Sequence, residues 1–297
     1  MQNNLSIKKS WQRSSHYLMK ILFLILFLGV TLMTSFSSCS SSKNPSQAPN
    51  AQINENQENL RVMSYNIHHA NPPSRPDVID IDAIVATIKT HDPDFVSLQE
   101  VDANTERSGK GNQAGIIAER LGMYFYFAKA LNYDGGRYGN AILSKYPLKN
   151  ATSQILPNAP DDITEERVLA FAEVKLPEGP EMIFASTHLD YKKDSSSRIV
   201  QLEKILEISQ KVGKPMILAG DFNDIEGSAT IKLLDSEFTR TCRDCAPTIP
   251  VNEPNRAIDF IAFTHPENKF KVKSHKVINE TYASDHLPII AVIELME

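Results

Sequence analysis

Cysteine is scarce in this sequence, which holds three cysteines in 297 residues: Cys39, Cys242 and Cys245. The last two form a Cys-x-x-Cys spacing, and no further Cys or His follows at a distance that is standard for zinc ligands. The spacing therefore argues against a zinc site at this cysteine pair. A local disulfide between Cys242 and Cys245 is the predicted role of the pair.

Positive charge is also in short supply, because 31 lysines and arginines stand against 36 aspartates and glutamates. If residues 1–38 are removed from the mature protein, four basic residues and no acidic ones are lost, which leaves 27 against 36, a net charge of −9. Tight, non-specific binding of nucleic acid needs clustered positive charge that displaces counterions from phosphates. Duplex nucleic acid is therefore not an expected partner, although a local basic patch is compatible with this balance.

The apolar run at the N-terminus, Ile21–Met33, falls short of the roughly 20 residues that span a bilayer. Basic residues precede this run and small residues follow it up to Cys39, which is the order of an export signal. Phe36-Ser37-Ser38-Cys39 is similar to a bacterial lipobox, with Phe36 at the position where leucine is usual. We predict a signal peptide over residues 1–38 and an exported lipoprotein, anchored to the membrane through Cys39 on the periplasmic or cell-surface side. A single anchoring helix is the alternative.

Residues 39–59 are rich in Ser, Asn, Gln and Pro and have little apolar content, so they are predicted to form a flexible tether. From Leu60 onward, apolar strands alternate with amphipathic segments, without an internal repeat or a second linker. With 41% hydrophobic residues the chain has ample material for a buried core. We expect residues 60–297 to form one domain and the protein to be a monomer.

Apolar periodicity places the elements of this domain. Helical stripes occur at 81–88 and 199–206. Strands are expected at 61–67, 94–101, 139–144, 168–176, 181–189, 215–219, 258–264, 271–277 and 287–295. Strands outnumber helices and some follow each other directly. This pattern favours a sheet-on-sheet core with helices outside, rather than a purely parallel doubly wound sheet.

Polar side chains stand where the predicted strands end, and such side chains converge on one rim of a sheet. They are Asn66, Glu100, His188, Asp221, Asn223, Asp285 and His286. Taken singly, each has a plainer explanation. Gly220–Asn223 suits an ordinary turn, Asp285-His286 a loop hydrogen bond, and a lone buried histidine is usually satisfied in a core.

The order of these groups along the chain is more specific than any one of them. Six groups occur in order across the domain: Asn66, Gln99-Glu100, Thr187-His188-Leu189, Gly220-Asp221-Phe222-Asn223, Ile258-Asp259-Phe260 and Ser284-Asp285-His286. With them the sequence resembles the endonuclease/exonuclease/phosphatase superfamily, which includes deoxyribonuclease I-like nucleases, bacterial sphingomyelinases and inositol polyphosphate 5-phosphatases. The resemblance covers about Leu60 to Leu295. It implies an α/β (α+β) fold, a four-layer sandwich in which two central mixed sheets pack face to face with helices outside. It also implies dependence on Mg²⁺ or another divalent cation such as Mn²⁺ or Ca²⁺.

A hard cation ligated by carboxylates is the natural catalyst of phosphoester hydrolysis, because anionic oxygens repel the nucleophile and the leaving oxygen departs as an anion. Glu100 is the expected main metal ligand. By resemblance, Asn66 and Asp285 complete or support the metal site, Asp285 directly or through water. A strand-end cap is the alternative for Asn66.

His286 is the expected general base or proton carrier, oriented by Asp259, since a buried carboxylate fixes the tautomer and favours the imidazolium. A salt bridge to Arg256 is the alternative role of Asp259. By resemblance, Asp221 positions or deprotonates the attacking water. Which of Asp221 and His286 takes the proton stays open at this point.

The resemblance gives two further side chains a part in transition-state binding. Asn223 is expected to hold a phosphate oxygen and His188 to donate to the transition state. The sequence also departs from the family pattern. Ala257 stands where many relatives carry an arginine, and His68 stands where nuclease relatives often carry an acidic metal-site residue. The second departure disfavours a DNA-repair nuclease.

Rim segments are expected to select the substrate. Arg137, within a predicted loop over 132–139, Asn140 and Lys192 are the candidate substrate contacts, with solvated turns as the alternative for the loop and for the segment around Lys192. The predicted function is hydrolysis of a phosphoester by activated water, on a lipid head group or another small phosphorylated molecule. An extracellular nuclease and a catalytically inactive surface-binding lipoprotein are the alternatives.

Overall fold

The computed structural model describes residues 59–177, 179–264 and 269–296. The predicted signal peptide, Cys39 and residues 39–58 of the predicted tether lie outside the described residues. Within the described ranges, no helix combines the length and the apolar character needed to cross a bilayer.

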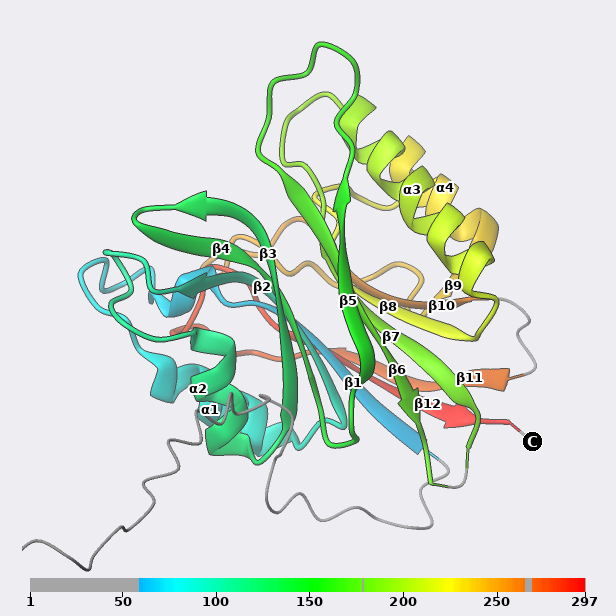
Figure 1. Ribbon diagram of the computed structural model, residues 1–297, viewed down its shortest axis with the longest axis horizontal. Helices are drawn as coiled ribbons and strands as arrows, with labels where there is room; N and C mark the ends of the chain where they lie inside the picture. The colour runs from blue at the N-terminus through cyan, green and yellow to red at the C-terminus, as the bar shows by residue number, and fades with distance from the viewer. Residues whose placement is uncertain (1–58, 178, 265–268, 297) are drawn as a thin grey trace, which may run out of the picture. The chain divides into compact units, whose positions relative to one another are not determined.

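Two six-stranded sheets form the centre of the domain (Figure 1). The first sheet has the order β11-β12-β1-β2-β4-β3, with bounds Phe270–Val277, Ile289–Leu295, Asn59–Asn66, Phe95–Ala103, Gly136–Ser144 and Tyr124–Tyr133. The second has the order β5-β6-β7-β8-β10-β9, with bounds Lys149–Leu156, Arg167–Lys175, Glu181–His188, Met216–Asp221, Asp259–Thr264 and Phe238–Arg240.

Each sheet contains one parallel pair near its middle, β1 with β2 and β7 with β8, and its other pairings are antiparallel. A helix connects the strands of each parallel pair: α1 (Ile81–His91) crosses from β1 to β2, and α3 (Ser196–Val212) from β7 to β8. A parallel connection requires such a crossover. Each crossover therefore places the carboxyl-terminal ends of its two strands side by side in the same sheet.

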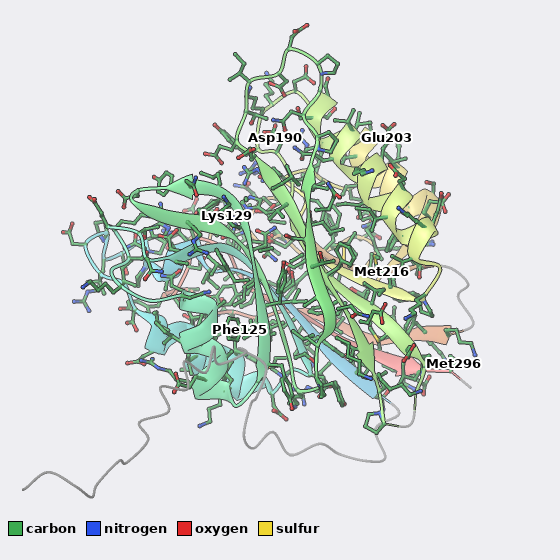
Figure 2. All side chains as sticks on the ribbon, viewed as in Figure 1. Phe125, Lys129, Asp190, Glu203, Met216 and Met296 are labelled. Atoms are coloured by element: carbon green, nitrogen blue, oxygen red, sulfur yellow. A yellow bond between two sulfur atoms is a disulfide. The ribbon has the colours of Figure 1, made fainter. Side chains whose placement is uncertain are left out.

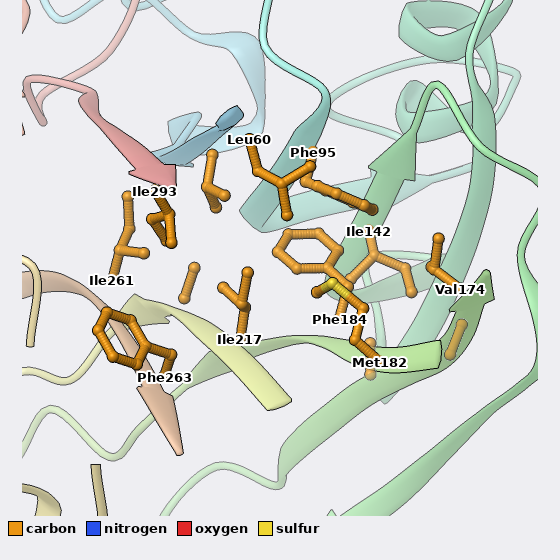
Figure 3. Close-up of a cluster of buried hydrophobic side chains, with 14 of the residues drawn as sticks. Leu60, Phe95, Ile142, Val174, Met182, Phe184, Ile217, Ile261, Phe263 and Ile293 are labelled. Carbon is orange, nitrogen blue, oxygen red and sulfur yellow. The ribbon is translucent and has the colours of Figure 1, made fainter. Parts of the chain in front are cut away.

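The largest apolar cluster lies between the sheets and includes Phe95, Phe184, Ile217 and Ile293 (Figure 3). Alternation along the strands builds it, because successive side chains point to opposite faces. In β7, for instance, Phe184 joins this cluster whereas its neighbour Ala185 joins the cluster beneath α3.

Helices cover both outer faces (Figure 1). The apolar sides of α1 and α2 (Gln113–Leu121) pack on the first sheet, and those of α3 and α4 (Ala229–Glu237) on the second. The result is the predicted four-layer sandwich, which is confirmed.

Local sequence sets the helix ends. Asp80 caps α1 by accepting a hydrogen bond from the Ala83 amide, and Ser228 caps α4 through the Ile231 amide. Gly122 and Gly213 end α2 and α3 in the left-handed conformation that glycine adopts without strain.

The expected loop over 132–139 is wrong. β3 and β4 form a hairpin whose two-residue turn, Asp134-Gly135, has φ values of 46° and 75°. Asp-Gly is a strong signal for this turn, but the surrounding glycines concealed the strands. Apolar periodicity also failed to predict α2, β3, β5, α4 and β9. The predicted disulfide between Cys242 and Cys245 is present.

Candidate active site

The ends of strands from both sheets meet at one rim. Asn66 pairs with Gln99 at the end of the parallel pair in the first sheet, and His188 pairs with Asp221 at the end of the parallel pair in the second. β10 runs antiparallel to β8 and begins with Asp259 opposite Asp221. Register therefore gathers Asn66 and Gln99 at one end of the first sheet, and His188, Asp221 and Asp259 at one end of the second.

A buried polar network joins the two sheets beneath the rim. The Ser97 hydroxyl donates to Ser186 Oγ at 2.7 Å and also lies 2.9 Å from the carbonyl oxygen of Ala219, while Gln99 Nε2 donates to Ser97 Oγ at 2.6 Å. Hydrogen bonds in a buried setting have strict geometric demands. This network fixes how the strand ends of one sheet face those of the other.

A cavity of about 350 Å³ opens at the rim. Six of the predicted site residues line it: Glu100, His188, Asp221, Asn223, Asp285 and His286. The remaining lining residues are Arg107, Leu131, Tyr133, Tyr138, Glu165, Arg167, Tyr191 and Ile249. Acidic, imidazole, guanidinium and aromatic groups thus converge on one cavity, which is more polar than most small-ligand sites and suits a charged ligand.

Asp259 holds His286. Oδ2 of Asp259 lies 2.9 Å from Nδ1 of His286 and accepts a second hydrogen bond from Thr248 Oγ1 at 2.5 Å. Burial opposes a charge on His286, but Asp259, Asp221 and Asp285 outweigh it and raise the pKa of His286 to about 10. The ring is therefore held as an imidazolium with Nε2 directed at Asp221.

Asp221 lies between two imidazoles. Its Oδ2 is 3.6 Å from His188 Nε2 and 3.7 Å from His286 Nε2. Its Oδ1 accepts a hydrogen bond of 2.8 Å from the backbone N–H of Asn223. Burial and the neighbouring Asp259 raise the pKa of Asp221 to about 7, against the opposite effect of His286. A carboxylate with a pKa in this range can exchange a proton near neutral pH.

Glu100 reaches the cavity through a β-bulge. The register between β2 and β4 shifts between Leu98 and Val101, and Glu100 has a left-handed φ of 57°. Bulges redirect side chains and often stand beside active sites. The carboxylate accepts a hydrogen bond from Asn66 Nδ2 at 3.1 Å, and the same nitrogen donates to Asp221 Oδ2 at 3.2 Å.

Two compact groups of ligand atoms lie at this rim, each within 4.8 Å: Asp221, Asp259 and His286 in one, and His68, His69 and Glu100 in the other. Asp259 and His286 already bind each other. Free oxygen donors for a hard cation are therefore better supplied by Glu100, Asp221 and Asp285, which line the cavity. Three carboxylates that converge on one cavity supply oxygen ligands of the kind that hard cations prefer, so the residues present fit a divalent cation.

His188 is buried, and its Nδ1 has no hydrogen-bond partner among the described residues. Burial, Arg167 and His286 hold the pKa of His188 well below its ordinary value. The ring is therefore neutral. Nε2 lies 3.6 Å from Oδ2 of Asp221, and this acceptor favours the proton on Nε2, so His188 is suited to donate a hydrogen bond into the cavity rather than to carry charge.

Arg167 is a site residue that sequence reasoning missed. It begins β6, is only 3% exposed, and lines the cavity. Its ion pair with Glu165 is 3.3 Å long, and its Nε is buried without a partner in the described part of the chain. A buried guanidinium with incomplete pairing is unfavourable unless an anion completes it. The one available signal was a cationic residue at the edge of an apolar strand.

Arg107, which the sequence analysis did not single out, lines the cavity together with Tyr133 and Tyr138 of the predicted rim segment. Asp102 holds Arg107 through hydrogen bonds of 2.7 and 2.9 Å. The guanidinium carbon lies 4.5 Å from the ring centroid of Tyr133 and 5.8 Å from that of Tyr138. Such stacking fixes the planar cation and both rings at the cavity mouth.

The predicted substrate contacts lie elsewhere. Asn140 is buried, donates to the Val168 carbonyl at 2.9 Å and does not line the cavity. Arg137 borders a separate hollow at the β3–β4 hairpin. Nζ of Lys192 forms an ion pair of 2.5 Å with Oδ1 of Asp162. Lys192 follows two residues after the buried Asp190, which is labelled in Figure 2. Asn223 does line the cavity, but its Nδ2 donates to the Leu189 carbonyl at 3.0 Å.

A profile of the Endonuclease/Exonuclease/phosphatase family matches residues 63–286. The chain belongs to the endonuclease/exonuclease/phosphatase family. Within it, the chain is 26% identical to the uncharacterized protein YbhP of Escherichia coli K12 over 254 residues, which cover 80% of this chain and 98% of YbhP.

Two solved structures share the fold. A member from Beutenbergia cavernae superposes with a TM-score of 0.68 at 25% identity, covering 81% of this chain and 72% of that one. A mannosyl-6-phosphatase from Bacteroides thetaiotaomicron superposes with a TM-score of 0.64 at 22% identity, covering 80% and 100%. The domain thus has the phosphoesterase fold of the family, with a buried Asp221, Asp259 and His286 cluster at its rim.

Proposed function

We propose that this domain hydrolyses a phosphoester of a lipid head group or another small phosphorylated molecule, with Mg²⁺ or a similar divalent cation as cofactor. One observation carries the proposal: a buried aspartate, Asp221, faces two imidazoles in a cavity that also holds Glu100 and the incompletely paired Arg167.

The geometry suggests how the residues divide the reaction. Asp221 orients the attacking water and accepts its proton as the new bond to phosphorus forms. His286, held by Asp259, donates its Nε2 proton to the leaving ester oxygen as that bond breaks. The proton then returns from Asp221 to His286 across their 3.7 Å contact, which restores the starting state.

The phosphoryl group itself needs anion-binding partners. Arg167 supplies a fixed positive charge, and neutral His188 supplies an Nε2 donor for an oxygen on which charge develops. A divalent cation held by Glu100, with Asn66 and Asp285 in support, would neutralise the phosphoryl oxygens when bound.

Size and charge favour a compact substrate. The cavity volume of about 350 Å³ suits a phosphorylated head group or sugar. Its walls offer aromatic faces from Tyr133 and Tyr138 and one planar cation, Arg107, rather than a long basic stripe. A net charge of −9 after removal of residues 1–38 disfavours duplex nucleic acid.

The test is a side-by-side panel on the purified full-length protein in detergent, at physiological salt with Mg²⁺. The substrates are sphingomyelin, phosphatidylinositol, mannose 6-phosphate and plasmid DNA, and Glu100→Gln protein prepared identically controls for contaminating phosphatases. Mannose 6-phosphate is included because the Bacteroides structure is named for it. We expect the highest turnover per enzyme on a phospholipid or the sugar phosphate.

Two results would contradict the proposal. Efficient Mg²⁺-dependent nicking of plasmid without hydrolysis of the other substrates would establish an extracellular nuclease. Absence of hydrolysis across the panel, with every cation tested, would favour an inactive binding lipoprotein.

We further propose that the protein is exported and tethered by lipid at Cys39, which would hold the cavity near phospholipid.

A further inference from the structure

The chain leaves β1 through an unusual backbone. His68, His69 and Ala70 have φ values of 45°, 45° and 58°, so three successive residues with side chains adopt the left-handed conformation. Each such residue is strained by about 1 kcal/mol or more. A run of this kind persists only when surrounding contacts enforce it, and it marks a place where side-chain direction matters.

Hydrogen bonds from Asn71 and Gln113 hold this left-handed turn in place. Asn71 Nδ2 donates to the carbonyls of Pro76 at 2.9 Å and Val78 at 2.7 Å, which closes the following loop. Gln113 Nε2 donates to the His69 carbonyl at 2.6 Å. The buried Gln113 thereby ties the turn to α2, and both imidazoles are held on the side of Glu100.

The donor atoms of these imidazoles are set up for a metal. Nδ1 of His68 donates to the Asn71 carbonyl at 2.9 Å, so its proton is on Nδ1 and the lone pair is on Nε2. A second hydrogen bond of this type commonly orients a metal-bound histidine. Nδ1 of His69 is buried without a hydrogen-bond partner in the described ranges.

Glu100 supplies the third donor. Among the residues that the structure describes, Asn66 is the hydrogen-bond partner of its carboxylate, through Oε1. Ligand atoms of His68, His69 and Glu100 all lie within 4.8 Å of one another. The nearby Arg107 is neutralised by its bidentate contact with Asp102, which weakens its repulsion of a cation.

We propose that His68, His69 and Glu100 bind a transition-metal ion, of which Zn²⁺ is the best probe, next to the oxygen-lined position for Mg²⁺. Two imidazoles and one carboxylate suit Zn²⁺, whereas Mg²⁺ prefers oxygen donors. The proposal shares only Glu100 with the proposed function, so direct binding of Zn²⁺ tests it separately from hydrolysis.

The experiment uses full-length protein without a histidine tag, freed of metal and equilibrated with saturating Mg²⁺. Calorimetric titration with Zn²⁺ gives the affinity and stoichiometry, and the visible spectrum of bound Co²⁺ reports nitrogen coordination. The variants are His68→Asn, His69→Asn and their combination, because asparagine tolerates positive φ better than alanine. His91→Asn, at the end of α1, is the matched control.

We expect about one Zn²⁺ per chain, and a loss of affinity of about 10–100-fold in each single variant. His91→Asn should bind like the wild type, and thermal unfolding without metal should be similar in all five proteins. Absence of Zn²⁺ binding to the wild type would overturn the proposal. So would unchanged affinity and an unchanged Co²⁺ spectrum in the double variant. Loss of phosphoester hydrolysis with Zn²⁺ binding intact would instead remove the proposed function alone.

Discussion

Nδ1 of His286 lies 2.9 Å from Oδ2 of Asp259, although His286 precedes a strand of the first sheet and Asp259 begins a strand of the second. This contact spans the two halves of the sandwich at the rim. It fixes the ring so that Nε2 faces Asp221. Proton transfer at the site therefore depends on the packing of the sheets against each other.

Removal of this pair should slow the chemical step. His286→Asn is expected to lower kcat by about 10²–10⁴-fold, because a general acid or base contributes that much. Asp259→Asn should lower kcat less, since the ring stays in place but loses its orienting charge. Steady-state kinetics checks both, with His91→Asn as control. Full activity in both variants, together with loss of activity in Asp221→Asn, would show that the assignment to His286 and Asp259 is wrong.

Metal dependence should run through Glu100. Glu100→Gln is expected to be nearly inert at any Mg²⁺ concentration, because an amide is a far weaker ligand for a hard cation than a carboxylate. Glu119→Gln, on the exposed side of α2, should retain wild-type kcat/KM. Chelation of the wild type should abolish hydrolysis and Mg²⁺ should restore it. Wild-type turnover in Glu100→Gln, or after exhaustive chelation, would refute the metal requirement.

Arg167 should contribute to binding of the phosphoryl group. Arg167→Gln is expected to lower kcat/KM by about 10–100-fold, the effect of losing a charged hydrogen bond. Arg167→Lys should recover little, because Lys lacks the planar fork of donors. Arg243→Gln, an exposed arginine on the same half of the domain, controls for a general change of charge. Unaltered kcat/KM in Arg167→Gln would show that the Arg167 guanidinium does not bind the phosphoryl group.

His275 should make the stability of the fold sensitive to acid. Burial lowers the pKa of His275 to about 4, and its Nδ1 lies 2.8 Å from Thr241 Oγ1. The unfolded chain takes up a proton below its ordinary pKa of about 6.5, whereas the folded chain resists protonation until about 4. The contribution of His275 to the free energy of unfolding is therefore fully present above about pH 6.5 and is lost as the pH falls toward 4.

Chemical denaturation at pH 7.5 and 4.5 measures this loss. The free energy of unfolding of the wild type should fall by about 2 kcal/mol more than that of His275→Gln, which has no titrating ring. Other acidic groups titrate equally in both proteins, so the difference isolates His275. Equal pH dependence in the two proteins would show that the histidine is protonated in the fold without penalty.

Anchoring should depend on Cys39. In a bacterial host, Cys39→Ala is expected to leave an unprocessed or soluble protein, whereas the wild type partitions into detergent with the mass of a lipidated chain that starts at Cys39. Detergent partitioning and mass spectrometry give both readouts. The same partitioning and mature mass in Cys39→Ala would exclude lipidation at this residue.

Sequence by itself determined the layers and much of the rim. Period-two apolar runs and two helical stripes were enough for sheets packed face to face with helices outside, because burial of alternate side chains leaves few other solutions. Strand ends are also legible in sequence. For that reason the sequence predicts six site residues that line one cavity in the structure: Glu100, His188, Asp221, Asn223, Asp285 and His286.

Tertiary structure decided which neighbours complete the site. Arg137 and Tyr138 are adjacent in β4, yet only Tyr138 lines the cavity, since successive side chains of a strand point to opposite faces. Arg167 and Arg107 reach it from distant segments of the chain, and the bulge at Glu100 follows from pairing with β4. Local periodicity reports how a segment is buried; it does not report which remote segments it meets, because that depends on register and on sheet packing formed across the whole domain.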